Sequence, residues 1–185
     1  MIEKIRPLEQ EKWQDYALEF NYTSYNYYDV EIKQNASGFN VSFTKKPFDK
    51  PYVKKDDNPD KLFQPWWEDA KAWGIVDDND KLIAVIETAA EGWSNRLRVT
   101  ALWIDSAYHR QGIGSALMDL AVKRAKEEKR RVVMLETQSS NETAIAFYLA
   151  YGFTLIGFDT CCYGNNDIQK KEVRIELGLF LECEN

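Results

Sequence analysis

A glycine-rich turn between two regular segments is the clearest indication of a ligand-binding site in this sequence of 185 residues. Residues 108–117 read YHRQGIGSAL and separate an expected strand at 97–104 from an expected amphipathic helix at 112–129. Gly112 and Gly114 permit a tight turn and a close approach of the backbone to a ligand. The first amides of a helix lack intrahelical partners and lie at the positive end of its dipole. The turn therefore predicts a site for a phosphate or pyrophosphate group, although a tight turn that binds nothing stays open.

Residue identity excludes two other phosphate-binding motifs. The third glycine of the dinucleotide fingerprint would fall at Leu117, and the sequence has no Gly-Lys-Ser/Thr triplet. The expected ligand is thus neither a dinucleotide in a Rossmann fold nor a nucleoside triphosphate in a P-loop.

A second segment combines an acid, an amide and a phenol around one predicted helix. Residues 134–153 read MLETQSSNETAIAFYLAYGF. Ser139 and Glu142 have the spacing of a capping box, and Gly152 is a typical helix end. Glu136 before the helix and Tyr148 within it are candidate proton carriers, because carboxylates and phenols serve as general bases and acids.

Composition narrows the class of function. The formal net charge is −6, which argues against a general nucleic-acid binder and suits a cationic small substrate, although a charge that only aids solubility stays open. The cysteines Cys161, Cys162 and Cys183 are odd in number and lack Cys-x-x-Cys spacing, and His109 is the single histidine. We therefore expect no disulfide framework, no metal and no Ser-His-Asp apparatus. Cys161 and Cys162 are expected to pack on a strand.

The sequence predicts a cytoplasmic protein that does not bind membranes. Residues 1–10 lack the apolar core of a signal peptide. No apolar run approaches the roughly 20 residues that cross a bilayer. The choice between monomer and homodimer stays open.

Hydrophobic periodicity predicts a mixed α/β sheet within one domain spanning residues 1–185. We expect helices at 9–20, 61–70, 112–129 and 139–152, and a loop at 45–59. The expected strands are 29–33, 39–44, 72–76, 82–88, 97–104, 132–135, 153–158 and 172–180.

Together the two segments resemble the acetyl-CoA signature of the GNAT family of N-acetyltransferases. That signature has a Q/R-x-x-G-x-G/A loop followed by N-x-x-A-x-x-F-Y-x-x-x-G-F. The resemblance implies the GNAT fold, an α/β (α+β) arrangement with a mixed, mostly antiparallel central sheet flanked by helices on both faces. It also implies acetyl-CoA as cosubstrate, bound by a core at about 97–158, and a substrate-side part at about 1–96. One departure is His109, which stands where the family usually has Gln or Arg, with Arg110 next to it.

The same resemblance implies roles for individual residues. The end of the strand before the loop would pair with the pantetheine arm, the loop would hold the pyrophosphate, and Asn141 would hydrogen-bond the pantetheine. Tyr148 would lie near the sulfur and return a proton to the leaving thiolate. The residues of this implied cofactor site are Leu102, Trp103, Ile104, Arg110, Gln111, Gly112, Ile113, Gly114, Ser115, Asn141 and Tyr148.

An acceptor amine also needs a base, because it is mostly protonated at neutral pH. Many GNATs place a Glu on the strand before the loop, where this chain has Thr100 and Ala101. Glu136, on the next strand, is similar in place to the Glu base of the bacterial family that acetylates ribosomal-protein N-termini. We therefore predict Glu136 and Tyr148 as the catalytic residues, and a purely structural role for Glu136 stays open.

Several segments look like streptothricin acetyltransferases, which acetylate the β-lysyl amine of a cationic antibiotic. These are residues 134–138, the Ala-x-x-Phe-Tyr helix, residues 157–160 and, more loosely, 43–44 and 51–54. The implied substrate contacts are carboxylates and aromatic faces that attract a cation, namely Glu136, Asp159, Glu87, Trp93 and Tyr27, with Tyr25 and Trp67 as further aromatic candidates. Simple packing is the alternative for each aromatic side chain.

Two other functions stay open. Acetylation of a protein N-terminus or lysine predicts a shallow, open groove, whereas the aromatic-rich N-terminal part suggests a covered pocket. A non-catalytic acetyl-CoA-binding module is the other alternative, and the presence of both Glu136 and Tyr148 argues against it.

Overall fold

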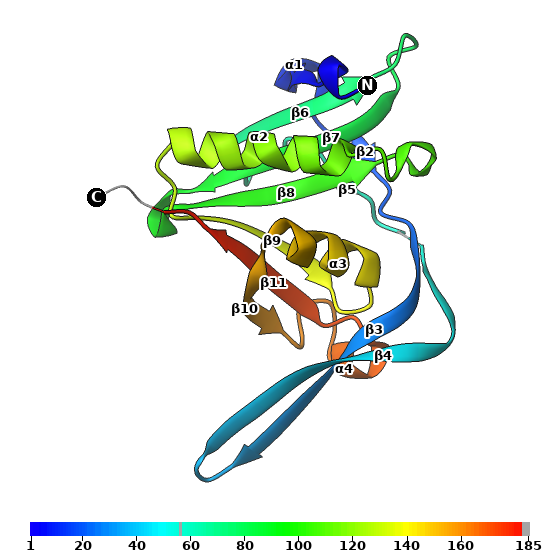
Figure 1. Ribbon diagram of the computed structural model, residues 1–185, viewed down its shortest axis with the longest axis vertical. Coiled ribbons are helices and arrows are strands. Elements are labelled where there is room, and N and C mark those ends of the chain that lie inside the picture. Colours follow the sequence, from blue (N-terminus) through cyan, green and yellow to red (C-terminus); the bar gives the residue numbers. More distant parts are fainter. Residues whose placement is uncertain (56, 183–185) are drawn as a thin grey trace. The chain divides into compact units, whose positions relative to one another are not determined.

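The structure is a computed structural model that describes residues 1–55 and 57–182 (Figure 1). The chain divides into two compact units. Of the described residues, unit 1 comprises 1–20, 57–135 and 178–182, and unit 2 comprises 21–55 and 136–177.

Unit 1 contains most of a sheet, and a long helix packs on it. Its helices are α1 (Gln10–Trp13) and α2 (Ile113–Glu127). Its strands are β1 (Arg6–Leu8), β2 (Ala17–Leu18), β5 (Asp60–Lys61), β6 (Glu68–Val76), β7 (Leu82–Glu91) and β8 (Arg96–Ile104), and β9 (Val132–Gln138) begins in it.

Unit 2 is built around a long hairpin and a second helix. The hairpin strands are β3 (Tyr22–Asn35) and β4 (Gly38–Lys54), and the helices are α3 (Glu142–Tyr151) and α4 (Asp167–Lys170). The unit also contains β10 (Thr154–Asp159) and most of β11 (Arg174–Phe180).

The central sheet is mixed and mostly antiparallel, as predicted. Hydrogen-bonded neighbours follow the order β1-β6-β7-β8-β9-β11-β10. Strands β1, β6, β7 and β8 pair antiparallel in that order. Strands β8 and β9 pair in parallel, from Arg96 opposite Val132 to Arg98 opposite Met134. The expected strands at 97–104 and 132–135 are thus confirmed, and so is the hairpin of β6 and β7.

The central strand β7 is covered on both faces. Its residues from Leu82 to Ala90 are all buried, as in a strand with packing on either side. Figure 1 shows α2 lying along β6, β7 and β8. A separate cluster joins α1 and β2 to Leu62 and Phe63 over Leu82, Val85 and Ala101.

Two predicted helices are wrong, because tertiary pairing outweighs local periodicity. The expected helix 9–20 ends at Trp13. The Asp15 amide donates to the Leu62 carbonyl (3.0 Å), and the Leu62 amide donates to the Tyr16 carbonyl (3.1 Å). The same pairing, with β2 antiparallel to β5, prevents a helix at 61–70. Trp13 and Leu18 nevertheless point into the core, as their apolar character predicts.

The hairpin of unit 2 is much longer than the two predicted strands. Its turn lies between the two predicted strands, as expected. In this turn, Asn35 Oδ1 accepts from the Ser37 amide (2.8 Å) and the Ser37 hydroxyl (2.6 Å). Pairing runs from Asn35 opposite Gly38 to Tyr22 opposite Lys54, with an irregularity between Ser24 and Asn26. The expected loop at 45–59 is therefore wrong over residues 45–54, where strand pairing tolerates the two prolines at an edge.

Other differences concern the second half of the chain. The cap of α3 is Asn141, whose Oδ1 accepts from the Ala144 amide (3.2 Å), rather than Ser139. Gly152 ends α3 with φ 112°, as predicted. Cys161 and Cys162 are exposed free thiols beyond the end of β10, so their predicted burial on a strand is wrong. Cys183 lies outside the described residues.

A buried arginine connects α2 to the sheet of unit 1. The Arg124 side chain is 4% exposed. Its Nη1 donates to the Thr88 carbonyl and hydroxyl, each at 2.9 Å, and its Nη2 donates to Asp69 Oδ2 at 2.8 Å. Its Nε donates to Glu128 Oε1 at 2.7 Å. This network fixes the helix that begins at the glycine-rich turn.

We expect Arg124→Ala to lower the free energy of unfolding by about 3 kcal/mol or more, because it leaves buried acceptors and a carboxylate without their donor. Chemical denaturation measures this loss. The control is Lys123→Ala on the same helix, whose 3.8 Å ion pair with Glu127 is exposed and whose loss should cost less than about 1 kcal/mol. Equal, small losses for both variants would contradict the structural role of Arg124.

Candidate active site

The predicted phosphate-binding turn of unit 1 has the backbone geometry of a helix N-terminus open to a ligand. Gly112 caps α2 in the left-handed conformation (φ 77°), and no side chain caps the helix there. Arg110, two residues earlier, is also left-handed (φ 59°). Because the amides of the first helical turn have no intrahelical acceptor, Ile113, Gly114 and Ser115 present donors to an anion. The backbone present thus fits a pyrophosphate group.

The loop before this helix is tied back to the end of β8. His109 Nε2 donates to the Ile104 carbonyl (2.9 Å), and Asp105 Oδ1 accepts from the Ala107 amide (3.0 Å). Lys81 makes a 3.0 Å ion pair with Asp105. His109 is therefore more than a solvent-exposed loop residue, because it closes the loop onto the strand end that carries Leu102, Trp103 and Ile104.

Tyr148, in unit 2, is a buried phenol. It lies on α3 among Phe147 and Phe153, with ring centroids 5.4 and 5.9 Å away. Burial raises the pKa of Tyr148 to about 12. The side chain therefore keeps its proton at neutral pH, as a general acid must before it donates.

Glu136 lies on β9 in unit 2 and is paired with a residue that the sequence did not indicate. Its Oε2 is 2.5 Å from Arg174 Nη2, and its side chain is 36% exposed. Arg174 also donates to Glu176 (2.7 Å). Because Arg174 lies in the next strand, 38 positions further along the sequence, spacing alone gave no signal for the pair.

Hydrogen bonds at Ser139 fix the corner between β9 and α3. The Ser139 amide donates to the Val173 carbonyl (2.8 Å), and its hydroxyl donates to the Lys171 carbonyl (2.8 Å). The same hydroxyl accepts from the Val173 amide (3.1 Å). The Ser139 carbonyl accepts from the Tyr28 amide of the hairpin (2.9 Å). Asn141 follows as the helix cap, and its predicted contact with pantetheine stays a prediction.

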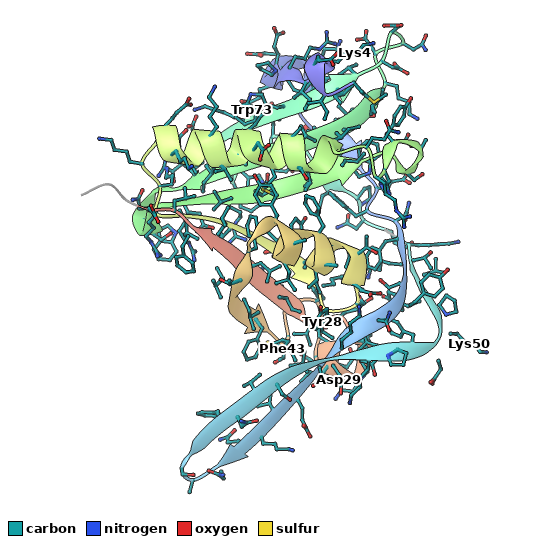
Figure 2. All side chains as sticks on the ribbon, viewed as in Figure 1. Lys4, Tyr28, Asp29, Phe43, Lys50 and Trp73 are labelled. Atoms are coloured by element: carbon teal, nitrogen blue, oxygen red, sulfur yellow. The ribbon has the colours of Figure 1, made fainter. Side chains whose placement is uncertain are left out.

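Three aromatic side chains of the hairpin pack on one another in unit 2, and of these three only Tyr27 was among the predicted substrate contacts. Tyr27 packs against Phe48 (4.6 Å between ring centroids), and Phe48 stacks on Tyr52 (5.2 Å). Lys171 lies 5.2 Å from the Tyr27 ring, so this ring already faces a cation. Asp29, labelled in Figure 2 beside Tyr28, pairs with the same Lys171 (2.9 Å).

Polar ends of two further tyrosines hold the hairpin to the corner. The Tyr22 hydroxyl donates to Gln138 Oε1 (2.7 Å) and lies 2.8 Å from the Ser140 hydroxyl. Tyr52 and Lys54 both donate to Glu172 Oε1. The tyrosine-rich run at residues 22–28 was the available signal for Tyr22. Tyr52 lay in a segment predicted to be a loop, although residues 51–54 belong to the looser resemblance.

The other predicted substrate residues occupy different surroundings. Asp159, at the end of β10 in unit 2, is exposed and accepts from the Cys161 amide (2.8 Å), which lowers the pKa of its carboxyl group. Trp93, in unit 1, is 85% exposed and precedes β8, at the opposite end of that strand from Ile104. Of the other aromatic candidates, Tyr25 is exposed and Trp67 is partly exposed. The exposed carboxylate of Asp159 is accessible to a cation, whereas the surroundings of Trp93, Tyr25 and Trp67 add no support for a role in substrate binding.

Glu87 is a buried structural carboxylate of unit 1. It is 1% exposed, and its oxygens accept from the Phe63 amide and the Thr100 hydroxyl, each at 2.7 Å. Thr100 lies at the register shift in β8, since Glu87 is opposite Ala101 and Thr88 is opposite Val99. Glu87 thereby connects the left-handed Phe63 to the irregular part of β8, and we leave it out of the proposed substrate contacts.

Comparison with known proteins identifies the family. The model of the Acetyltransferase (GNAT) family matches residues 39–153, more than half of the chain. The protein belongs to the GNAT family. It is an acyltransferase with the mixed sheet of that fold. Among the described residues, no group of three or more His, Cys, Asp and Glu side chains is arranged to hold a metal ion, and none of the helices is long and apolar enough to cross a membrane.

Three proteins similar to this GNAT protein are named as acetyltransferases of streptothricin or nourseothricin. Streptothricin acetyltransferase A of Bacillus subtilis is 29% identical over 67% of this chain and 71% of its own. A nourseothricin acetyltransferase structure superposes with a TM-score of 0.75 over 97% of each chain at 24% identity. The structure of a putative streptothricin acetyltransferase from Bacillus anthracis, in complex with acetyl coenzyme A, has a TM-score of 0.70 at 21% identity and covers 96% of this chain and 97% of its own.

We expect the stability of the protein to depend on pH through Glu87. Burial raises the pKa of this carboxyl above its usual 4.5, although the hydrogen bonds from Thr100 and Phe63 oppose the shift. The unfolded chain ionises first as pH rises, so the stability that Glu87 contributes falls from about pH 4.5 upward through the folded pKa. Glu87→Gln lacks this dependence. The unfolding free energy of Glu87→Gln should therefore increase relative to that of the natural protein as the pH rises from 4.5 to 8.

Denaturation curves at several pH values measure this difference. Glu87→Ala is the control, because it also lacks the titrating group but removes the acceptor of the buried Phe63 amide, and it should be about 1–3 kcal/mol less stable than Glu87→Gln at each pH. Parallel pH profiles for the natural protein and Glu87→Gln would contradict the assignment.

Proposed function

We propose that this GNAT acetyltransferase transfers the acetyl group of acetyl-CoA to an amine of a cationic small molecule, with the β-lysyl amine of streptothricin as the first candidate. The observation that carries the proposal is the nearly complete superposition on a nourseothricin and a streptothricin acetyltransferase, at 97% and 96% of this chain. The family model itself spans residues 39–153, whereas the two structures also cover β3 and β11. The similarity therefore extends to the parts of unit 2 that surround Glu136.

The cosubstrate would be held by backbone atoms of unit 1. The amides of Ile113, Gly114 and Ser115 at the start of α2 would bind the pyrophosphate, assisted by Arg110 and Gln111 in the exposed loop. Backbone groups of Leu102, Trp103 and Ile104 would pair with the pantetheine arm. When bound, acetyl-CoA supplies the activated acetyl group, and no metal is needed for that step.

Proton transfer would be the task of unit 2. Glu136, directly or through water, would accept the proton that the acceptor ammonium loses. Tyr148 would donate its proton to the thiolate, which is chemically consistent with a phenol that is protonated at neutral pH. Direct attack of the amine on the thioester would gain most of its rate from the alignment of the two reactants.

A cationic acceptor suits the charges and rings around this unit. The chain carries a net charge of −6, which attracts a cation over a distance of about one Debye length. The carboxylates of Glu136 and Asp159 and the face of Tyr27 are the proposed contacts for the ammonium groups of the substrate. Because Lys171 already lies over Tyr27, a second cation on that ring would have to displace it or use the opposite face.

We expect release of CoA thiol with streptothricin to exceed that with polyamines, aminoglycosides and peptide N-termini when all are tested at equal concentration. The assay uses acetyl-CoA and the full chain. Turnover confined to peptides would replace the small-molecule proposal with a protein acetyltransferase. Tight acetyl-CoA binding without turnover on any of the acceptors would contradict the proposed substrate class.

Tyr148→Phe should lower kcat by about 10²-fold while acetyl-CoA affinity changes little, because a general acid acts on the leaving group rather than on ground-state binding. Steady-state kinetics and calorimetric titration measure the two quantities. Phe147→Leu is the matched control on the same helix, since it removes a neighbouring ring but no proton. An unchanged kcat in Tyr148→Phe would rule out the assigned role of the phenol.

A further inference from the structure

We infer that Arg174 is a positioning residue for Glu136, an inference that rests on the proposed role of Glu136 as the base. One guanidinium group connects three side chains of unit 2. Arg174 Nη2 lies 2.5 Å from Glu136 Oε2 and 2.7 Å from Glu176 Oε1. Its Nη1 lies 3.6 Å from Cys162 Sγ.

The carboxylates of Glu136 and Glu176 both contact Arg174 Nη2, which restricts the orientation of the guanidinium group. A guanidinium is planar and its N–H directions are fixed, unlike the single point charge of an ammonium. Glu176, two residues along the same strand, therefore sets the plane of Arg174, and Arg174 in turn sets the direction of Glu136. With two carboxylates and one guanidinium, the cluster keeps a net negative charge suited to a cationic acceptor.

The neighbouring strand β10 is adapted to this arrangement. A Cβ on Gly157 would lie 3.0 Å from Glu176 Oε2, closer than carbon and oxygen comfortably approach. The glycine thus leaves the space that the Glu176 carboxylate occupies. This role differs from that of Gly112, whose positive φ requires glycine for backbone reasons.

Partial burial separates the cluster from an ordinary surface ion pair. The side chains of Arg174, Glu136 and Glu176 are 22%, 36% and 27% exposed. Arg174 Nε is buried, with no hydrogen-bond partner among the described residues. Freely exposed pairs hold geometry weakly, whereas a partly desolvated pair with fixed donors restricts the carboxylate to few orientations. Glu136 would therefore meet its substrate already oriented.

The test compares Arg174→Gln, Arg174→Lys and Glu176→Gln with the natural protein in steady-state assays of acetyl transfer. Arg174→Gln should lower kcat by about 10- to 100-fold, because a misdirected group loses alignment with the reacting atoms, and should leave acetyl-CoA affinity nearly unchanged. Arg174→Lys should restore part of the loss, because it keeps the charge but not the fork. Cys162→Ser is the control that removes the thiol contact only, and its kcat should stay within about 2-fold of the natural value.

A double-mutant cycle decides whether Arg174 acts through Glu136. If it does, Arg174→Gln should cause almost no further loss in a Glu136→Gln background. The same fold-loss in both backgrounds would overturn the positioning role and leave Glu136 as the base. A fully active Glu136→Gln would overturn both the base and the positioning residue. Should Arg174→Gln fail to fold in thermal denaturation, Glu176→Gln enters the same cycle, because it disturbs the guanidinium without removing it.

Discussion

The hydrogen bonds between Ser139 and the segment from Lys171 to Val173 are the constraint on which unit 2 depends. The Ser139 hydroxyl donates to one carbonyl of that segment and accepts from one amide, while its own backbone amide donates to Val173. Glu136 lies just before this point, the cap of α3 just after it, and the hairpin is bound to its carbonyl through Tyr28. A buried serine whose polar atoms are all hydrogen-bonded is rigid. It therefore fixes the relative orientation of β9, α3 and the hairpin within unit 2.

Arg124 and Arg174 use the same guanidinium group for two different structural purposes. Arg124 in unit 1 is 4% exposed and is surrounded by carbonyls, a hydroxyl and carboxylates. Its fork geometry fastens a helix to a sheet. Arg174 in unit 2 is 22% exposed and holds side chains that stand near the solvent. A guanidinium can do either because it has five donors in a fixed plane and remains charged when partly desolvated.

The first strand of the unit 2 hairpin, β3, lies outside the segment that the family model matches. The family model ends short of β11 and begins within β4, yet the structures of a nourseothricin and a streptothricin acetyltransferase cover nearly the whole chain. Rings of Tyr22, Tyr27, Phe48 and Tyr52 are packed on one another along this hairpin. Packed aromatic rings bury a large apolar area in specific relative orientations, which gives the hairpin a defined shape.

Local patterns in the sequence determined the regular second half of the fold and the residue types of the site. The glycine turn at Gly112, the amphipathic helix after it and the Gly152 stop follow from short-range preferences, and the structure reproduces them. Tertiary structure alone decided the first half, where the pairing of residues 15–16 with Leu62 and of β2 with β5 ends one expected helix at Trp13 and excludes the other. It also decided the partners of Glu136 and Glu87, because Arg174, Thr100 and Phe63 are distant in sequence. Hydrogen bonds and ion pairs between distant segments depend on which strands become neighbours, and periodicity within one segment carries no information about that choice.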